Sequence, residues 1–456
     1  MKNQLALYFL LLIFSFCLFT CDTNDPPPLD NGNGNKKEKK ITLTIDDTSP
    51  TEIWLNLQTE NIQLPDTFSL LRNNETVITL ELFDSNYVIY EDSLLPSQSY
   101  IYQVSSIKNQ VLSSEITAVP MDTTSHDFSY EVFEFGEHRN SVLRDVAIID
   151  ENNIWAVGAI YLNDSTGQRD PHAYNAVHWD GTEWTIKRIR YYGDCSAVEY
   201  PPLYSLYAFS SEEIVLTNGG SIGWFDGENL ILDCGVNPLL TGAINKIWGT
   251  SSSNLYVVGG NGSIAHYNGT SWSKLESGTE LTLSDVYGTN NNEVYASGVE
   301  VFKSGIVLKG NSSGFSVYKE SGYVNENELF ETLYAELGSV WVDEKGTLYT
   351  GGSYLYWQRR GEWDFVESLS ENSFQANIGA PARGYITGIT GNGSNDYLIS
   401  GGRNTLQHYN GISWRQIGME YSPSNSIIWR CVEQKGNLII GVGEINNRAI
   451  IIKLKR

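Results

Sequence analysis

Residues 246–272 read KIWGTSSSNLYVVGGNGSIAHYNGTSW, and this stretch decides the fold because its parts recur along the chain. The first part, two apolar runs of which the second ends in Gly259, recurs at 145–158 and 285–298. The last part, with Asn268-Gly269 before Trp272, recurs at 178–184 and 408–414, and a shortened form stands at 225–227. Short apolar runs separated by Asp-Gly or Asn-Gly predict strands joined by hairpins in which both turn residues have positive φ. The repeat therefore predicts an all-β protein.

Weaker copies extend the repeat to seven units between residues 128 and 456. The aromatic of the second apolar run, or its replacement, stands in these units at Trp155, Val215, Tyr256, Tyr295, Tyr349, Tyr397 and Ile439. Seven units in this range average about 47 residues each, which is the length of a four-stranded propeller blade. We therefore expect a seven-bladed β-propeller over residues 128–456.

A propeller has to close its ring, and the two ends of the repeat region supply the strands. Residues 128–135 form an apolar run before the first complete unit, whereas the last unit stops at 449–454 without an outer strand. Pairing these two runs would leave no open sheet edge. We expect strand 128–135 to complete the last blade.

Charge excludes one class of partner. The 456 residues include 30 Lys and Arg against 54 Asp and Glu, so the formal net charge is −24. A surface of this sign repels the phosphate backbone, which excludes nucleic acid as an expected partner.

The first 40 residues predict export and anchoring. An apolar run from Leu5 to Phe19 follows one early Lys and is typical of a signal peptide, here 1–20, which is removed from the mature protein. The segment Leu18-Phe19-Thr20-Cys21 resembles the bacterial lipobox, which implies a lipidated Cys21; the alternative is ordinary signal cleavage near Thr20. Residues 21–40 are rich in Pro, Asn, Gly and Lys and predict a flexible tether. The expected location is the cell envelope, with the chain lipid-anchored to the outer membrane and facing the periplasm or the cell surface.

Residues 41–121 alternate between apolar and polar side chains in about seven short runs, which predicts an immunoglobulin-like sandwich. The segment Leu94-Leu95-Pro96-Ser97-Gln98-Ser99-Tyr100 resembles a motif of fibronectin type III domains. That resemblance implies that Tyr100 hydrogen-bonds to nearby backbone. Residues 122–127 are then a hinge before the propeller. The whole arrangement resembles bacterial surface lipoproteins that join a fibronectin type III-like domain to a propeller of kelch-like or sialidase-like blades.

One position of the repeat varies more than its neighbours and is the candidate ligand site. It directly precedes the apolar column of the innermost strand and is occupied by Asp145, Ser205, Lys246, Asp285, Ser339, Gly388 and Arg430. Side chains on innermost strands reach the central channel, so we single out Asp145, Lys246, Asp285 and Arg430 as ligand-binding candidates. The alternative is a channel lining whose charges pair internally. The long segments 160–176 and 188–202 are the next candidates.

Besides the lipidated Cys21, three cysteines remain after the predicted processing. Cys431 falls in the apolar column of the innermost strand, where we expect it to act as a small buried side chain. Cys195 and Cys234 both follow an Asp in loops after consecutive blades and could form a disulfide, which spacing alone leaves open. Thr123, in Asp122-Thr123-Thr124, resembles the short acceptor pattern of bacterial O-glycosylation.

The sequence identifies no metal site, cofactor or catalytic residue. His178, His266 and His408 share one position of the repeat, and equivalent positions on different blades point apart, so a structural role is expected. The sialidase motif S-x-D-x-G-x-x-W is not met, because Asp180 and Gly181 are adjacent. We therefore expect a non-catalytic binding module for glycan or protein, with a carbohydrate-active hydrolase or lyase as the alternative. The oligomeric state is left open.

Overall fold

The computed structural model describes residues 37–191, 195, 199–290, 292–301, 303–322, 336–365, 384–419 and 426–456. The predicted signal peptide, Cys21 and the tether up to residue 36 lie outside these residues. Every regular element of the described residues is a strand, apart from one short 3-10 helix, η1 (Asn237–Leu239). The prediction of an all-β protein is confirmed. No helix in the described ranges is both long and apolar enough to cross a bilayer.

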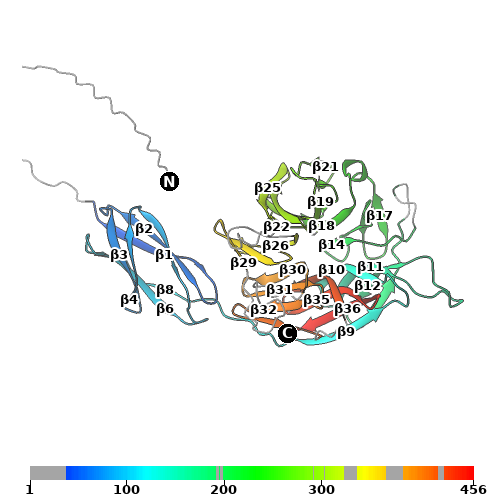
Figure 1. Ribbon diagram of the computed structural model, residues 1–456, viewed down its shortest axis with the longest axis horizontal. Helices are drawn as coiled ribbons and strands as arrows, with labels where there is room; N and C mark the ends of the chain where they lie inside the picture. Colours follow the sequence, from blue (N-terminus) through cyan, green and yellow to red (C-terminus); the bar gives the residue numbers. More distant parts are fainter. Residues whose placement is uncertain are drawn as a thin grey trace, which may run out of the picture.

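The described residues contain nine sheets, and the first two lie within residues 40–118 (Figure 1). One has the order β1-β2-β5, and the other has the order β4-β3-β6-β7 with β8 also paired to β6. The strands are β1 (Lys40–Thr48), β2 (Ile53–Glu60), β3 (Asp66–Arg72), β4 (Glu75–Leu82), β5 (Asn86–Glu91), β6 (Tyr100–Ser106), β7 (Val111–Leu112) and β8 (Ile116–Ala118).

These two sheets share one apolar core. Alternate residues of β2, β3 and β6 are buried in it, among them Leu55, Phe68 and Tyr102. The Tyr100 hydroxyl accepts a hydrogen bond from the backbone amide of Leu95 at 3.0 Å, which is the kind of contact the sequence implied. This bond fixes the segment before β6 against the core.

The other seven sheets each have four antiparallel strands. In six of them the strands follow chain order, and in the last the fourth strand is β9 (Ser129–Phe135), which precedes all the others. The strands of the seven sheets are β10 (Val142–Asp150), β11 (Asn153–Ile160), β12 (Tyr174–Trp179), β13 (Trp184–Lys187); β14 (Ser205–Ala208), β15 (Ile214–Thr217), β16 (Ile222–Phe225), β17 (Leu230–Asp233); β18 (Ile244–Ser251), β19 (Asn254–Gly259), β20 (Ile264–Tyr267), β21 (Trp272–Leu275); β22 (Thr282–Asn290), β23 (Glu293–Glu300), β24 (Ser304–Asn311), β25 (Gly314–Glu320); β26 (Leu337–Val342), β27 (Leu348–Gly352), β28 (Leu355–Arg359), β29 (Glu362–Phe365); β30 (Ile386–Gly393), β31 (Asp396–Gly401), β32 (Leu406–Tyr409), β33 (Trp414–Gln416); and β34 (Ile427–Lys435), β35 (Leu438–Ile445), β36 (Arg448–Lys455).

The first strands of these sheets stand side by side in a ring. Each contacts the first strand of the next sheet, and β34 contacts β10, so the ring is closed. The outermost strand β9 pairs with β36 along its whole length, from Ser129 opposite Lys455 to Phe135 opposite Ala449. The ends of the region are therefore held together in one sheet, and apolar clusters pack each sheet against its neighbour.

The ring has two ends that differ in their connections. The end that we call the turn face holds the short hairpins between first and second strands, such as 150–153, and between third and fourth strands, such as 179–184. The opposite end, the loop face, holds the longer connections, such as 161–173 and 188–204. Because each sheet is an antiparallel meander, these two kinds of connection lie at opposite ends of its strands.

The hairpins on the turn face differ from the expected geometry. Gly181 has φ 96°, whereas Asp180 is not among the residues with positive φ. The Asp180 carboxylate instead accepts hydrogen bonds from the amides of Thr182 at 2.8 Å and Glu183 at 2.9 Å. The expectation of positive φ at both turn residues was wrong, because the Asp side chain satisfies the turn backbone and only the Gly needs the left-handed conformation.

Candidate functional site

Strand register places one side chain of each first strand at the same level of the ring. Six of the first strands have a bulge near their start, and the residues just after the bulge are Asp145, Lys246, Asp285, Ser339, Gly388 and Cys431. Ser205 stands at the start of β14, the remaining first strand. The ammonium of Lys246 on β18 reaches Asp145 on β10 past β14, so these side chains point to the centre of the ring.

The placement of Arg430 in this column was wrong. In β34 the register shifts between Trp429 and Cys431, so Arg430 is the extra residue of the bulge. It is exposed and forms an ion pair with Glu444. The other five strands share this bulge, but β34 lacks the second register shift that β10, β18, β22 and β30 have before their hairpins. Counting back from the second strand therefore placed the column one residue too early in β34. Cys431 takes the central position, and Val432 takes the place in the apolar column that was expected for Cys431.

Asp145 is the most buried charge of the column, with its side chain 3% exposed. Its carboxylate accepts hydrogen bonds from the Ser205 hydroxyl at 2.6 Å and from the Leu206 amide at 3.1 Å, and it pairs with the Lys246 ammonium at 2.7 Å. Burial lowers the pKa of Lys246, but the attraction of the nearby negative charges outweighs burial and holds it above its usual value. One carboxylate thus links three consecutive first strands.

Two further carboxylates bridge neighbouring first strands in the same way. Asp285 accepts hydrogen bonds from the Ser339 hydroxyl and the Val340 amide, both at 3.0 Å, and burial raises its pKa. Glu433, which the sequence did not single out, accepts a hydrogen bond from the Ile148 amide at 2.9 Å across the β34–β10 junction. Burial raises the pKa of Glu433 to about 7 and raises that of the neighbouring Cys431 thiol well above its usual value. A carboxylate at a position that is uncharged in the other units, such as Ala147 in β10 and Thr390 in β30, was the signal that could have identified Glu433.

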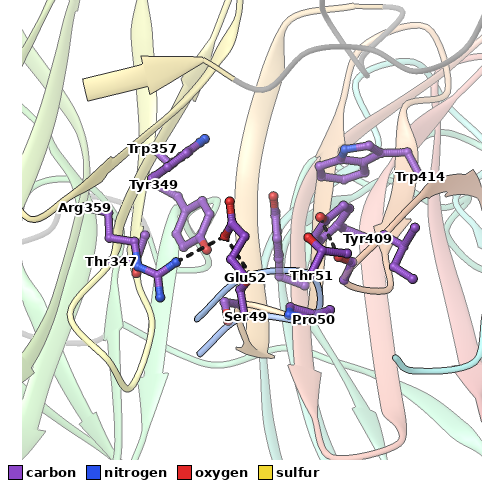
Figure 2. A pocket seen from close by; sticks show the side chains of 14 residues that line it. Ser49, Pro50, Thr51, Glu52, Thr347, Tyr349, Trp357, Arg359, Tyr409 and Trp414 are labelled. Carbon is purple, nitrogen blue, oxygen red and sulfur yellow. Dashed lines mark hydrogen bonds and ion pairs between the residues drawn. The ribbon is translucent and has the colours of Figure 1, made fainter. Parts of the chain in front are cut away.

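A cavity of about 310 Å³ lies between the N-terminal sheets and the turn face of the ring (Figure 2). The loop Ser49–Glu52 forms one wall, and two neighbouring sheets of the ring form the rest. The aromatic side chains in the lining are Tyr349, Trp357, Tyr397, Tyr409 and Trp414. Arg359 faces Glu52 across the cavity at 3.7 Å. Glu52 is the one carboxylate among the lining residues, whereas glycoside hydrolysis commonly uses two.

Comparisons with known proteins identify the ring. No protein-family model matches the chain, and no curated protein matches it in sequence. A solved structure described as YCF48 bound to D1 peptide covers 72% of this chain and 95% of its own, with a TM-score of 0.50 and 12% identity. YCF48 from Cyanidioschyzon merolae covers 71% and 98%, with a TM-score of 0.49 and 10% identity. The WD40 β-propeller domain of Doa1 covers 72% and 97%, with a TM-score of 0.44 and 14% identity.

The larger part of the chain is a β-propeller. At 12% identity the likeness shows the fold alone, so it assigns no ligand and no activity. The recurrent four-stranded sheets predicted from the sequence are those of this propeller.

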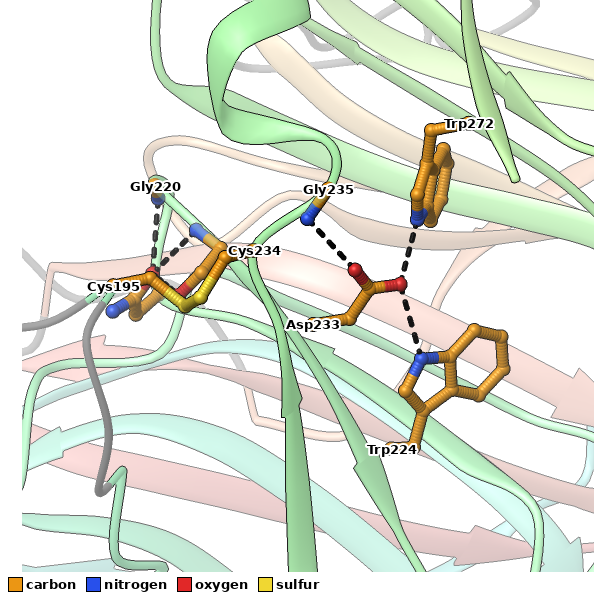
Figure 3. Close-up of a disulfide and its surroundings, with 9 residues drawn as sticks. Cys195, Gly220, Trp224, Asp233, Cys234, Gly235 and Trp272 are labelled. Atoms are coloured by element: carbon orange, nitrogen blue, oxygen red, sulfur yellow. Dashed lines mark hydrogen bonds between the residues drawn. A yellow bond between two sulfur atoms is a disulfide. The ribbon is translucent and has the colours of Figure 1, made fainter. Parts of the chain in front are cut away.

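A disulfide joins Cys195 to Cys234 on the loop face of the propeller, with 5.6 Å between the Cα atoms (Figure 3). It connects the loops that follow the first and second four-stranded sheets. Next to it, the Asp233 carboxylate accepts hydrogen bonds from the indoles of Trp272 at 2.8 Å and Trp224 at 3.4 Å. The loop after β17 is therefore fixed both covalently and by hydrogen bonds.

The three histidines of the repeat each bind a residue at the start of the second strand in their own sheet. The partners of His178, His266 and His408 are Asn153, Asn254 and Asp396, at 3.0, 2.7 and 2.7 Å. Within the described residues, no group of three or more His, Cys, Asp or Glu side chains could hold a metal ion.

His408 also connects the propeller to the hinge. Its ring Nδ1 lies 2.8 Å from His126 Nδ1, and Arg456 at the C-terminus pairs with the same Asp396 at 2.6 Å. Burial, with the neighbouring positive charges, lowers the pKa of His126 to about 4. Burial raises the pKa of Asp396, but hydrogen bonds from His408 and Arg456 hold it well below its usual value. Thr123 lies in this hinge and is part-buried, and its glycosylation stays a prediction.

Proposed function

We propose that the chain is a cell-envelope lipoprotein that binds a protein ligand, without catalysis, on the loop face of its propeller. In this proposal residues 1–20 direct export, Cys21 carries the lipid and residues 21–40 are the tether. The two N-terminal sheets are an immunoglobulin-like sandwich of the fibronectin type III kind, and the seven four-stranded sheets are the blades of one propeller. The outer membrane is the expected site of anchoring.

The observation that carries this proposal is the docking of the N-terminal sheets on the turn face. Asp47 pairs with Lys345 at 2.9 Å and with Arg359, and the guanidinium of Arg359 lies 3.7 Å from the ring centroid of Trp54. Arg359 is only 12% exposed there. These contacts hold the turn face towards the N-terminal end of the chain.

Further contacts fix the same arrangement. A Cβ atom on Gly411 would lie 2.5 Å from Pro50 Cγ, so only glycine permits this close approach. The Thr124 hydroxyl donates to the Asn395 carbonyl at 3.0 Å. An anchor at the N-terminus would therefore direct the loop face away from the membrane, where a partner can reach it.

Protein is the favoured ligand class, and the loop face is favoured over the ring centre as the binding site. The propeller that this chain resembles at a TM-score of 0.50 is a structure of YCF48 with a bound peptide. The central carboxylates Asp145, Asp285 and Glu433 already accept backbone amides of the next strand, which is a structural use. The aromatic cavity of Figure 2 favours the second candidate, a glycan ligand or a carbohydrate-active hydrolase or lyase, because aromatic side chains stack on sugar rings.

A parallel screen separates these candidates. The full chain is applied to a peptide array and a glycan array, and the same polysaccharides are tested for cleavage. We expect peptide binding without product formation. Glycan binding that is lost in Trp414→Ala would move the function to the cavity of Figure 2, and product formation that is lost on replacing one carboxylate would establish the enzyme instead.

The location has its own test. Cys21→Ala removes the proposed lipidation site, so we expect the variant to leave the membrane fraction or to stay unprocessed. Membrane fractionation with immunoblotting measures this, and Cys17→Ala, inside the same apolar run, is the matched control. A Cys21→Ala variant that fractionates with membranes like the wild type would contradict the anchor.

A further inference from the structure

The search for a ligand site on the loop face leads to Arg144, the residue of the bulge at the start of β10. It precedes Asp145, so it stands at the loop-face end of the ring centre. Its guanidinium carbon lies 4.7 Å from the ring centroid of Tyr204, at the start of the next sheet. The two side chains therefore form a stacked pair at the mouth of the channel.

Arg144 is partly buried but has no anionic partner among the described residues. It is part-buried, its Nε atom is inaccessible to solvent and without a hydrogen bond, and the described residues offer it no ion pair. The other described arginines that form no ion pair, Arg139, Arg169 and Arg403, are all exposed. A guanidinium withdrawn from water without an anion is costly, and such groups are normally paired.

The equivalent arginine in the neighbouring strand β34 is paired, unlike Arg144. Arg430 occupies the same bulge position in β34, which contacts β10, and it is paired with Glu444. Asp145, although next to Arg144 in sequence, pairs with Lys246 instead. Of the two arginines at this level of the ring, only Arg144 is free to pair with an anion from outside.

Tyr204, the aromatic member of this pair, also lines a cavity of about 450 Å³, although Arg144 itself is not part of the lining. Tyr204 lines it together with Asn218, Asn237 and the backbone of residues 219–220 and 240–243. The side-chain oxygen of Asn237 is inaccessible to solvent and has no hydrogen-bond donor in the described part of the chain. The site thus combines an unpaired cation with a cavity lined largely by glycine and other small residues.

We propose that Arg144 and this cavity bind a single carboxylate side chain on a peptide segment of the protein partner, a local ion pair that the net charge of −24, which repels a polyanion, does not prevent. The planar guanidinium suits a carboxylate, which it can bind through two parallel hydrogen bonds. The glycines and other small residues of the lining leave room for the peptide main chain. A sugar acid fits less well, because one face of Tyr204, the aromatic ring in the lining, is already covered by Arg144. This inference rests on the proposed function. It adds the residue that binds the partner and the chemical group that this residue recognises.

Fluorescence polarisation with two labelled hexapeptide pools tests the inference. In the acidic pool each peptide carries one Asp or Glu, and in the other pool Asn or Gln stands at the same position. We expect the full chain to bind the acidic pool, and Arg144→Gln to weaken this binding by about tenfold or more, the effect of losing one charge-assisted contact. Arg144→Lys keeps the charge without the planar fork and should fall between the two.

Arg169→Gln is the matched control. Arg169 lies on the same face, also stacks on a tyrosine, at 4.2 Å from the Tyr161 ring, and forms no ion pair in the described structure, but it is exposed. We expect it to change the affinity by less than about twofold. Unchanged thermal melting of the variants shows that they are folded.

Each other outcome contradicts a different statement. Equal losses of affinity in Arg144→Gln and Arg169→Gln would show that binding depends on diffuse charge attraction and not on this site. Equal binding of both pools would show that the ligand carboxylate is not recognised. Binding of polygalacturonate that depends on Arg144, without peptide binding, would replace the peptide by an acidic glycan. Failure of both pools and of the peptide array would overturn the proposed function itself.

Discussion

Replacing Val132 and Phe133 together by proline is expected to lower the melting temperature of the propeller by about 10 °C or more. In β9 these residues face Ile452 and Ile451 of β36, and at least one of two consecutive residues donates its amide to that partner strand. Phe133 also packs against Trp179 and Trp184 of the first four-stranded sheet. The variant therefore loses ladder bonds and apolar contacts at the one sheet that joins both ends of the ring.

The control places two consecutive prolines in an outer strand that does not join the two ends of the ring. Thr185→Pro with Ile186→Pro disrupts β13, the fourth strand of its sheet, whose partner β12 is its immediate neighbour in the chain. Loss of this strand frays one sheet and leaves the ring closed, so a smaller shift is expected in a thermal melt followed by circular dichroism. Equal shifts in the two variants would show that β9 does not hold the ring together.

The sequence could predict the fold class because turn residues mark the strand boundaries within each repeat. The Asn268-Gly269 hairpin and the strand runs around it recur often enough to reveal four-stranded units, and the structure has four-stranded sheets there. The sequence also predicted β9, because its apolar run precedes the first complete repeat and the last repeat lacks an outer strand. These features are local, and local features are visible in a single sequence.

The sites were less predictable, because they depend on register and on contacts between distant segments. Register shifts have no sequence signature, so the absence from β34 of the second shift found in β10, β18, β22 and β30 could not be seen, and Arg430 was placed at the ring centre instead of Cys431. Arg144 was overlooked because its neighbour Asp145 is the residue that matches the repeat. The cavity of Figure 2 brings Glu52 and Arg359 together from opposite ends of the chain, and no pattern in either segment indicates the other.

The second large effect is expected at Lys246. Replacing it by methionine keeps the volume of the side chain but leaves the 3% exposed carboxylate of Asp145 without its cation. Removing one partner of a buried ion pair costs about 3 kcal/mol or more, because the remaining charge is neither solvated nor compensated. Ser205 and Leu206 still donate to Asp145, so we expect a loss in the free energy of unfolding near that value rather than a failure to fold.

Burial, not distance, decides the size of this effect, and two further variants show it. Lys455 pairs with Glu151 at 3.1 Å, but the two side chains are 62% and 66% exposed, so Lys455→Met should cost less than about 1 kcal/mol. Asp145→Asn combined with Lys246→Met removes both charges and should recover part of the loss, since asparagine can still accept the Ser205 and Leu206 hydrogen bonds. Urea unfolding of wild type, of these three variants and of the single Asp145→Asn variant measures the coupling between the two charges. If Lys246→Met costs no more than Lys455→Met, or if the double variant loses the sum of its single changes, the charges at the ring centre do not stabilise one another and Asp145 and Lys246 are available to a ligand instead.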